Sequence, residues 1–292
     1  MDREVGRGGG VDRDVTVSRT GGLRRVTRPP HPALQPYLCG RIGYSHLAPA
    51  YEVRMVPTGH VRLTLSLAEP FSQIRRLGMP GAGTGRIGSV VVGMEDRPAW
   101  CAHAGGRQEV IRLEFTPLGA YRLLALPMRE LTNLAVELDD VLGAEAGVLV
   151  ERLAAARGWA ARFDLVDAML LARLGRGPEP APEVEHAWCL LSESAGTVPI
   201  ARLADEVGWS PSYLVRRFTE QVGLTPKTSA RVLRFHRATQ LLASGPVDLA
   251  EIAASCGFYD QAHLTREFRA LAGLTPGRMA TATRPADEAL AL

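Results

Sequence analysis

Two stretches near the C-terminus repeat one another: LADEVGWSPSYLVRRFTEQVGLTP at residues 203–226 and IAASCGFYDQAHLTREFRALAGLTP at residues 252–276. The glycines Gly208 and Gly257 are 49 positions apart, and one extra residue in the second copy brings every later matched pair to a spacing of 50. A repeat this regular predicts that both stretches fold into the same local structure.

Each copy has the layout of two helices joined by a tight turn. A glycine, Gly208 or Gly257, follows the first helix at a place where the chain needs a positive φ, and an aromatic residue comes next. Ser210 with Pro211 in the first copy, and Asp260 in the second, are residues that begin helices. Helix, glycine-containing turn and helix together make the helix-turn-helix plan.

The second helix of each copy presents an arginine at the same repeat position, Arg216 or Arg266, on the face opposite its apolar stripe. The N-terminal part of a recognition helix enters the major groove of DNA, where arginine can bond guanine with two hydrogen bonds. Because the arginine recurs in phase, DNA reading is favoured over an ordinary solvated face. Residues 226–243 predict a connecting helix of roughly 27 Å, and successive major grooves lie about 34 Å apart.

At these motifs, over about residues 199–283, the sequence resembles the AraC/XylS family of bacterial transcription regulators. The resemblance implies a seven-helix reader of two units that binds DNA near promoters. By matched position, the residues closest to bases would be Ser212, Val215 and Arg216 in the first unit and Gln261, Ala262 and Arg266 in the second. The apolar Val215 and Ala262 could contact only a thymine methyl group. The cations expected at phosphates are Arg217, Lys227, Arg231, Arg234 and Arg269.

The chain ahead of the repeat predicts a β-rich domain ended by helices, over residues 29–174. Period-two alternation or short apolar runs predict strands in a small antiparallel sheet or barrel, at 61–67, 89–92 and 111–115. Three- and four-residue spacing of apolar side chains predicts helices at 118–126, 144–157 and 160–174. The region to about residue 143 looks like a sensor-type domain that often precedes such units and has no assigned ligand.

Composition sets the remaining boundaries. Residues 1–28 are rich in Gly and Arg and predict a disordered basic tail. The stretch GRGPEPAPE at 175–183 predicts an interdomain linker, a place where few contacts cross. Residues 184–283 form the helical DNA-binding domain, and 284–292 a second tail. The fold class is therefore α+β and multidomain.

The sequence contains no motif typical of catalysis, nucleotide binding or metal binding. The thiols Cys39, Cys101, Cys189 and Cys256 are far apart, so we expect four scattered buried cysteines in a reducing compartment and no disulfide or zinc site. Residues 83–88 spell G-x-G-x-x-G but precede a strand, which indicates a loop and not a nucleotide site. With no catalytic cluster we expect no enzyme activity, cofactor or metal. No apolar run is long enough for a signal or a membrane span, so we expect a cytoplasmic protein.

Residues 201–283 contain ten basic and seven acidic residues, a modest net charge of +3, so base contacts must add to phosphate attraction. Over the whole chain, 33 of the 34 cations are Arg. The sequence predicts a DNA-binding transcription regulator that controls promoters and responds to an effector through its N-terminal domain. Double-stranded DNA is the expected partner. RNA polymerase, a small-molecule effector and a second copy of the chain are left open. The alternative is a ligand-binding module whose helical domain makes protein contacts.

Overall fold

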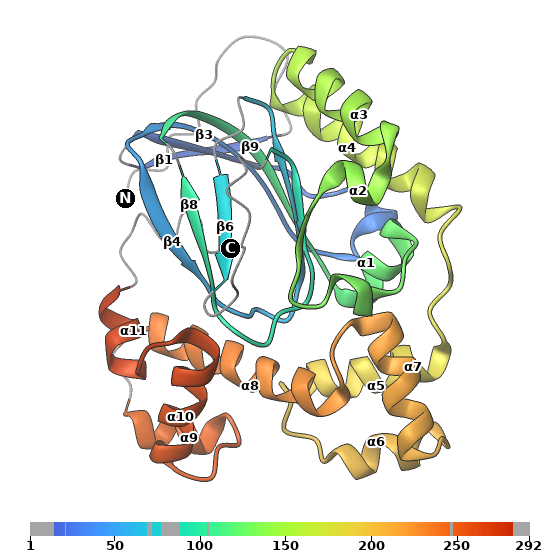
Figure 1. Cartoon of the computed structure of the whole chain (residues 1–292), viewed down its shortest axis with the longest axis vertical. Helices are drawn as coiled ribbons and strands as arrows, with labels where there is room; N and C mark the ends of the chain where they lie inside the picture. The colour runs from blue at the N-terminus through green and yellow to red at the C-terminus, as the bar shows by residue number, and fades with distance from the viewer. Residues whose placement is uncertain are drawn as a thin grey trace.

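The computed structural model describes residues 15–20, 22–68, 72–76, 88–103, 105–245 and 248–282. Its N-terminal part contains two antiparallel sheets, drawn from blue to green in Figure 1. The larger sheet has the strand order β1-β2-β3-β9-β5-β7-β10 and the smaller one β4-β8-β6. The strands are β1 (Thr16–Thr20), β2 (Leu23–Thr27), β3 (Leu38–Ala48), β4 (Tyr51–Met55), β5 (Val61–Ser66), β6 (Ser72–Arg76), β7 (Val90–Val92), β8 (Ala99–His103), β9 (Gly106–Phe115) and β10 (Ala135–Glu137).

The larger sheet lies between helices and the smaller sheet. Alternate residues of a strand point to opposite faces, so Leu63 and Leu113 are buried against helices while Arg62 points the other way. On that other face, the Tyr51 hydroxyl of β4 donates to Gln108 Oε1 of β9 at 3.3 Å, which joins the two sheets. The strands predicted from sequence are thus confirmed as β5, β7 and the second half of β9.

Helices cover the apolar face of the larger sheet (Figure 1). The N-terminal half contains η1 (Pro32–Leu34), α1 (Pro117–Leu124), η2 (Met128–Leu131), α2 (Leu138–Leu142), α3 (Ala144–Ala155) and α4 (Trp159–Leu174). The predicted helices are confirmed as α1, α3 and α4. The Trp159 ring packs so closely on the sheet that a Cβ on Gly43 would lie 2.2 Å from it, which only glycine permits.

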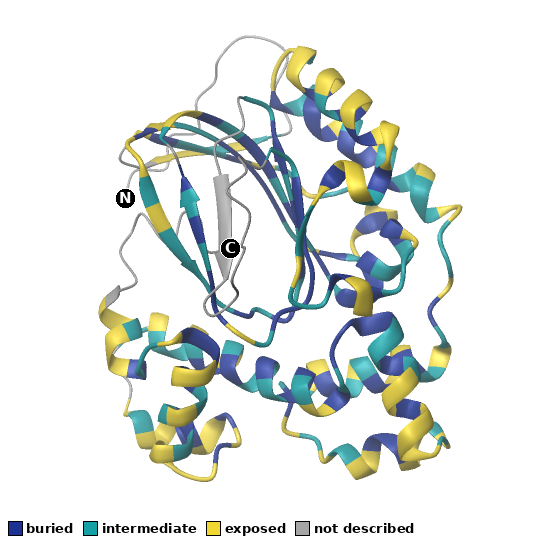
Figure 2. Ribbon diagram, viewed as in Figure 1, coloured by how far each residue is buried: buried dark blue, intermediate teal, exposed yellow. Residues whose placement is uncertain are grey.

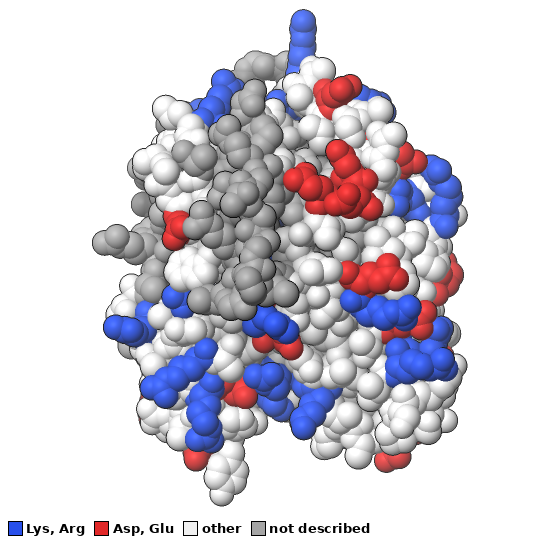
Figure 3. Space-filling model, viewed as in Figure 1, with Lys and Arg blue, Asp and Glu red and all other residues white. Residues whose placement is uncertain are grey.

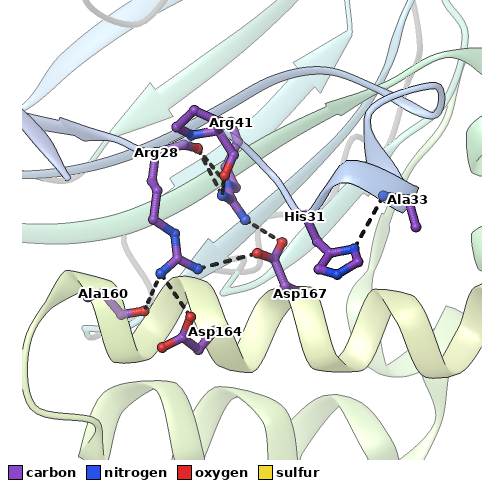
Figure 4. Close-up of polar contacts among 8 residues, drawn as sticks. Arg28, His31, Ala33, Arg41, Ala160, Asp164 and Asp167 are labelled. Carbon is purple, nitrogen blue, oxygen red and sulfur yellow. Dashed lines mark hydrogen bonds and ion pairs between the residues drawn. The ribbon is translucent and has the colours of Figure 1, made fainter. Parts of the chain in front are cut away.

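An arginine–aspartate network ties α4 to the sheet (Figure 4). The side chain of Arg41 on β3 is 1% exposed and donates to Asp167 Oδ1 at 2.5 Å. Arg28 donates to Asp167 at 3.3 Å and lies 2.8 Å from Asp164. The Phe163 ring lies 4.7 Å from the Arg41 guanidinium. Burial lowers the pKa of Arg41, and Asp167 opposes that shift.

The prediction of a disordered tail over residues 1–28 is wrong for its second half. β1 and β2 form a hairpin, and β2 continues into the larger sheet by pairing with β3. The Thr and Val residues of this stretch favour strands, and Gly-Gly at 21–22 is a hairpin signal, so a local pattern outweighs the overall composition. Residues 1–14, the G-x-G-x-x-G stretch apart from Gly88, and the second predicted tail at 284–292 lie outside the described residues.

The C-terminal part is helical, yellow to red in Figure 1. Its helices are α5 (Pro182–Glu193), α6 (Ile200–Val207), α7 (Pro211–Val222), α8 (Pro226–Ala243), α9 (Leu249–Ser255), α10 (Gln261–Ala272) and α11 (Pro276–Ala282). α5 begins inside the stretch predicted as a linker over 175–183. The structure also differs from the expectation that few contacts cross there. α7 packs on α1 and η2, and one apolar core runs from Leu123 and Met128 to Phe218 and Val222 (Figure 2).

Candidate nucleic-acid interface

Both repeat copies fold as helix, turn and helix. α6 ends at Gly208 with φ +66°, and the Ser210 hydroxyl accepts from the Tyr213 N–H at the start of α7. In the second copy, Gly257 has φ +72°, and Asp260 Oδ1 accepts from the His263 N–H of α10 at 2.6 Å. These are the turn glycines and cap residues that the sequence predicts.

The six residues predicted to lie near bases all reach the surface of α7 and α10. All six side chains are exposed: Ser212, Val215, Arg216, Gln261, Ala262 and Arg266. Behind them, Leu214 and Phe218 of α7 are buried, as are Leu264 and Phe268 of α10. Each recognition helix therefore keeps an apolar stripe in the core and presents the predicted residues to solvent from its N-terminal half.

Two aromatic side chains beside these residues were not singled out from the sequence. The Arg216 guanidinium lies 4.9 Å from the centre of the Tyr213 ring, which is 41% exposed. Tyr259, just ahead of α10, is 93% exposed. The ring of Tyr213 holds the Arg216 head over the start of α7 by a cation–π contact. Their exposure distinguishes these rings from aromatic residues of the core.

The five predicted phosphate contacts divide into two groups. Lys227 at the start of α8 and Arg269 on α10 are exposed, and Arg217 is half-buried with Glu220 Oε2 at 2.8 Å. Arg231 instead lies 2.7 Å from Glu267 of α10, and Arg234 donates to the Gly196 carbonyl at 3.2 Å.

Arg231 and Arg234 thus hold parts of the C-terminal domain together. The first joins α8 to the second unit, and the second joins α8 to the turn before α6 and lies 5.9 Å from the Phe258 ring. Burial lowers the pKa of Arg234, against the influence of Glu267. Figure 3 shows Lys and Arg gathered over the lower half of the visible face, where the C-terminal helices lie, with most of the acidic side chains higher up.

Comparison with known proteins agrees with this geometry. Residues 203–282 match a family model described as a helix-turn-helix domain. The HTH-type transcriptional regulator YbfI of Bacillus subtilis is 39% identical over 90 residues, which are 30% of this chain and 32% of that protein. MtrA of Neisseria gonorrhoeae, also an HTH-type transcriptional regulator, is 30% identical over 79 residues, 27% of this chain and 26% of that one.

The C-terminal part of this chain is a helix-turn-helix domain of the AraC type. The match to each curated relative spans about a third of that relative's length or less. Ahead of it, residues 26–137 match a domain of unknown function, DUF6597. The structure of ToxT from Vibrio cholerae aligns with 80% of this chain and 98% of its own, at 11% identity and a TM-score of 0.47.

A polar cluster lies between the two sheets ahead of the AraC-type domain. The Tyr51 and His103 rings stack with centroids 4.4 Å apart, and Cys101 Sγ lies 3.4 Å from His103 Nε2. Burial, with smaller effects from Arg112 and His46, lowers the pKa of His103 to about 4. Gln108 is fully buried, and its Nε2 has no hydrogen-bond partner among the described residues.

The described part of the chain offers neither a metal site nor a membrane-spanning helix. No group of three His, Cys, Asp or Glu residues there could hold a metal ion, and none of its helices is long and apolar enough to cross a membrane. Cys101 and Cys256 are buried as expected. The expectation is wrong for Cys39 and Cys189, which are exposed. The distance between cysteines along the sequence does not determine whether each one is buried.

Proposed function

We propose that this protein is a sequence-specific transcription regulator that reads double-stranded DNA with α7 and α10. One observation carries the proposal: matched repeat positions on the N-terminal halves of both helices are exposed and include Arg216 and Arg266. Because N-terminal residues of a recognition helix meet base edges, we expect both arginines to bond guanine. The names of the two curated relatives, both HTH-type transcriptional regulators, support the same function.

Base contacts are assigned to Ser212, Val215, Arg216, Gln261, Ala262 and Arg266, and phosphate contacts to Arg217, Lys227 and Arg269. Arg231 and Arg234, which the sequence also suggested for phosphates, are assigned instead to holding α8 in place, since their partners lie on other elements of the domain. Arg217 is kept as a phosphate contact because its partner, Glu220, lies on the same helix.

We further propose that the N-terminal domain responds to an effector. The fully buried Gln108 supports this, because a buried amide N–H without a partner costs free energy that a bound polar molecule could recover. Contacts with RNA polymerase and a homodimer are compatible with this proposal and are not needed for it.

The test uses the full-length protein and a pool of random-sequence duplexes, from which bound DNA is selected and then measured by gel shift. Arg216→Ala and Arg266→Ala should each weaken the selected duplex by about 1–3 kcal/mol and relax the preference at one base position. Arg152→Ala, an exposed arginine on α3, is the matched control and should bind as the wild type does. If no duplex is enriched, the helical domain serves protein contacts instead.

A further inference from the structure

The N-terminal domain contacts the C-terminal end of the first recognition helix. Thr132, directly after η2, donates its hydroxyl to the carbonyl oxygen of Gly223 at 2.5 Å. Gly223 ends α7 with φ +98°, and a Cβ there would lie 3.1 Å from the Met128 carbonyl oxygen. The backbone of the N-terminal domain therefore lies against the end of α7, where a side chain at position 223 would crowd the Met128 carbonyl.

The same domain contacts the C-terminal end of the second recognition helix from a different element. Arg54 of β4 donates from Nη1 to the carbonyl oxygen of Ala272, the last residue of α10, at 2.5 Å. Its guanidinium lies 4.5 Å from the centre of the Trp100 ring on β8. Gly273 follows with φ +66°, and a Cβ there would lie 2.9 Å from Arg54 Nη1.

The two accepting carbonyls lie within one residue of equivalent positions of the repeat, at Gly223 in the first unit and at Ala272, the residue before Gly273, in the second. Gly223 and Gly273 are matched residues, 50 positions apart. The last carbonyls of a helix have no partner inside the helix and carry the negative end of its dipole. A hydroxyl donor and a guanidinium satisfy one such carbonyl in each unit. The N-terminal domain thus binds each recognition helix at the end opposite the residues proposed to read bases.

The two contacts come from different sheets. Thr132 lies between η2 and β10, and β10 pairs with β7 of the larger sheet. Arg54 and Trp100 are paired residues of β4 and β8 in the smaller sheet. In Figure 1 the α10 unit lies under the smaller sheet, and the α7 unit lies under α1 beside the larger one. A shift between the sheets would therefore move α10 relative to α7.

We propose that the N-terminal domain sets the spacing between the two recognition helices by holding the C-terminal end of each, through Thr132 on α7 and Arg54 on α10. This inference rests on the proposed function. The smaller sheet is the part that moves, because β4 and β8 also carry Tyr51 and His103, which face the larger sheet. Because alternate residues point to opposite faces, Arg54 and Trp100 lie on the outer face of the same two strands. A change that moves Tyr51 or His103 therefore also moves the strands that carry Arg54 and Trp100.

The prediction concerns tolerance to half-site spacing. α7 and α10 each read one half-site of the DNA. A protein that holds the two helices rigidly accepts one distance between the half-sites and loses affinity when a base pair is inserted between them. The probes are a duplex selected by the full-length wild type and the same duplex with one base pair inserted or deleted. We expect the wild type to lose about tenfold in affinity, and Arg54→Met and Thr132→Val to lose only about threefold or less.

These substitutions are chosen to keep the fold. Methionine retains an apolar stem over Trp100, and valine has the shape of threonine without its hydroxyl. Arg54→Lys and Thr132→Ser keep a donor at each position and should restore the wild-type ratio. Arg107→Ala, exposed at the start of β9, is the control and should not change it. Circular dichroism checks that all variants are folded.

The ratio of the two affinities is the deciding quantity, since it does not depend on the overall strength of binding. The inference is overturned if Arg54→Met and Thr132→Val keep the wild-type ratio, or if the wild type itself tolerates the inserted base pair. A wild type that selects no duplex at all overturns the proposed function instead, so the two failures are distinguishable.

Discussion

Acidification should weaken the contact between α8 and the N-terminal domain, because two half-buried imidazole rings meet there. His60, in the loop before β5, and His236 of α8 have ring centroids 5.8 Å apart. Glu114 Oε2 lies 3.8 Å from His60 Nδ1, and Gln240 Nε2 lies 3.0 Å from His236 Nε2. Burial and Arg62 lower the pKa of His60.

The size of this loss of stability follows from the pKa of His236. Burial and, to a smaller extent, His60 lower its pKa from 6.5 to about 4, while Glu114 acts in the opposite direction. The unfolded chain therefore takes up this proton near pH 6.5, and the folded protein does so only near pH 4. The stability is fully present above about pH 6.5 and falls as the pH drops toward 4. Between about pH 7.5 and pH 5 the free energy of unfolding should fall by about 2 kcal/mol through this residue.

The assay is denaturant unfolding of the full-length protein followed by circular dichroism at both pH values. His103 shifts in the same direction, so the wild type should lose more than the share due to His236. The comparison with His236→Gln isolates that share, and this variant should lose about 2 kcal/mol less over the same range. His186→Gln, an exposed histidine of α5, is the control.

Equal pH dependence in the wild type and His236→Gln would refute the reasoning, since it would mean that His236 takes up its proton equally well in the folded protein. A change of the same size in His186→Gln would also refute it, because the effect would then not depend on burial at the α8 contact.

Three further predictions concern stability and DNA binding. Asp167→Asn should lower the free energy of unfolding by about 3–5 kcal/mol, because the buried Arg41 loses its charged partner; denaturant unfolding measures this. Gly223→Ala should lower the free energy of unfolding by about 1–3 kcal/mol because residue 223 has a positive φ. Gly147→Ala, in open space within α3, should raise it by about 0.5–1 kcal/mol. A lower free energy of unfolding for Gly147→Ala would contradict this reasoning. Lys227→Ala should reduce the slope of log affinity against log salt by about one unit on a selected duplex, and an unchanged slope would remove it from the phosphate contacts.

The helices of the AraC-type domain could be predicted because their signals are local. The turn glycine Gly208 and the cap residues Ser210 and Asp260 act within a few residues of themselves, and each helix begins or ends where they indicate. Alternation over residues 61–67 predicted β5 for the same reason. The hairpin of β1 and β2 also has a local signal, the Gly-Gly turn, but it lies in a stretch whose Gly- and Arg-rich composition is typical of a disordered tail.

The sequence by itself determined the two helix-turn-helix units and the exposure of Arg216 and Arg266, since helix periodicity alone decides which face a residue occupies. Only the tertiary structure decided that Arg231 is held by Glu267, and that Arg54 binds Ala272, 218 positions away. No local pattern encodes such partners, because an arginine's local sequence is the same whether a carboxylate, a carbonyl or water meets its guanidinium. That choice depends on which distant elements the packed apolar core brings within hydrogen-bond distance.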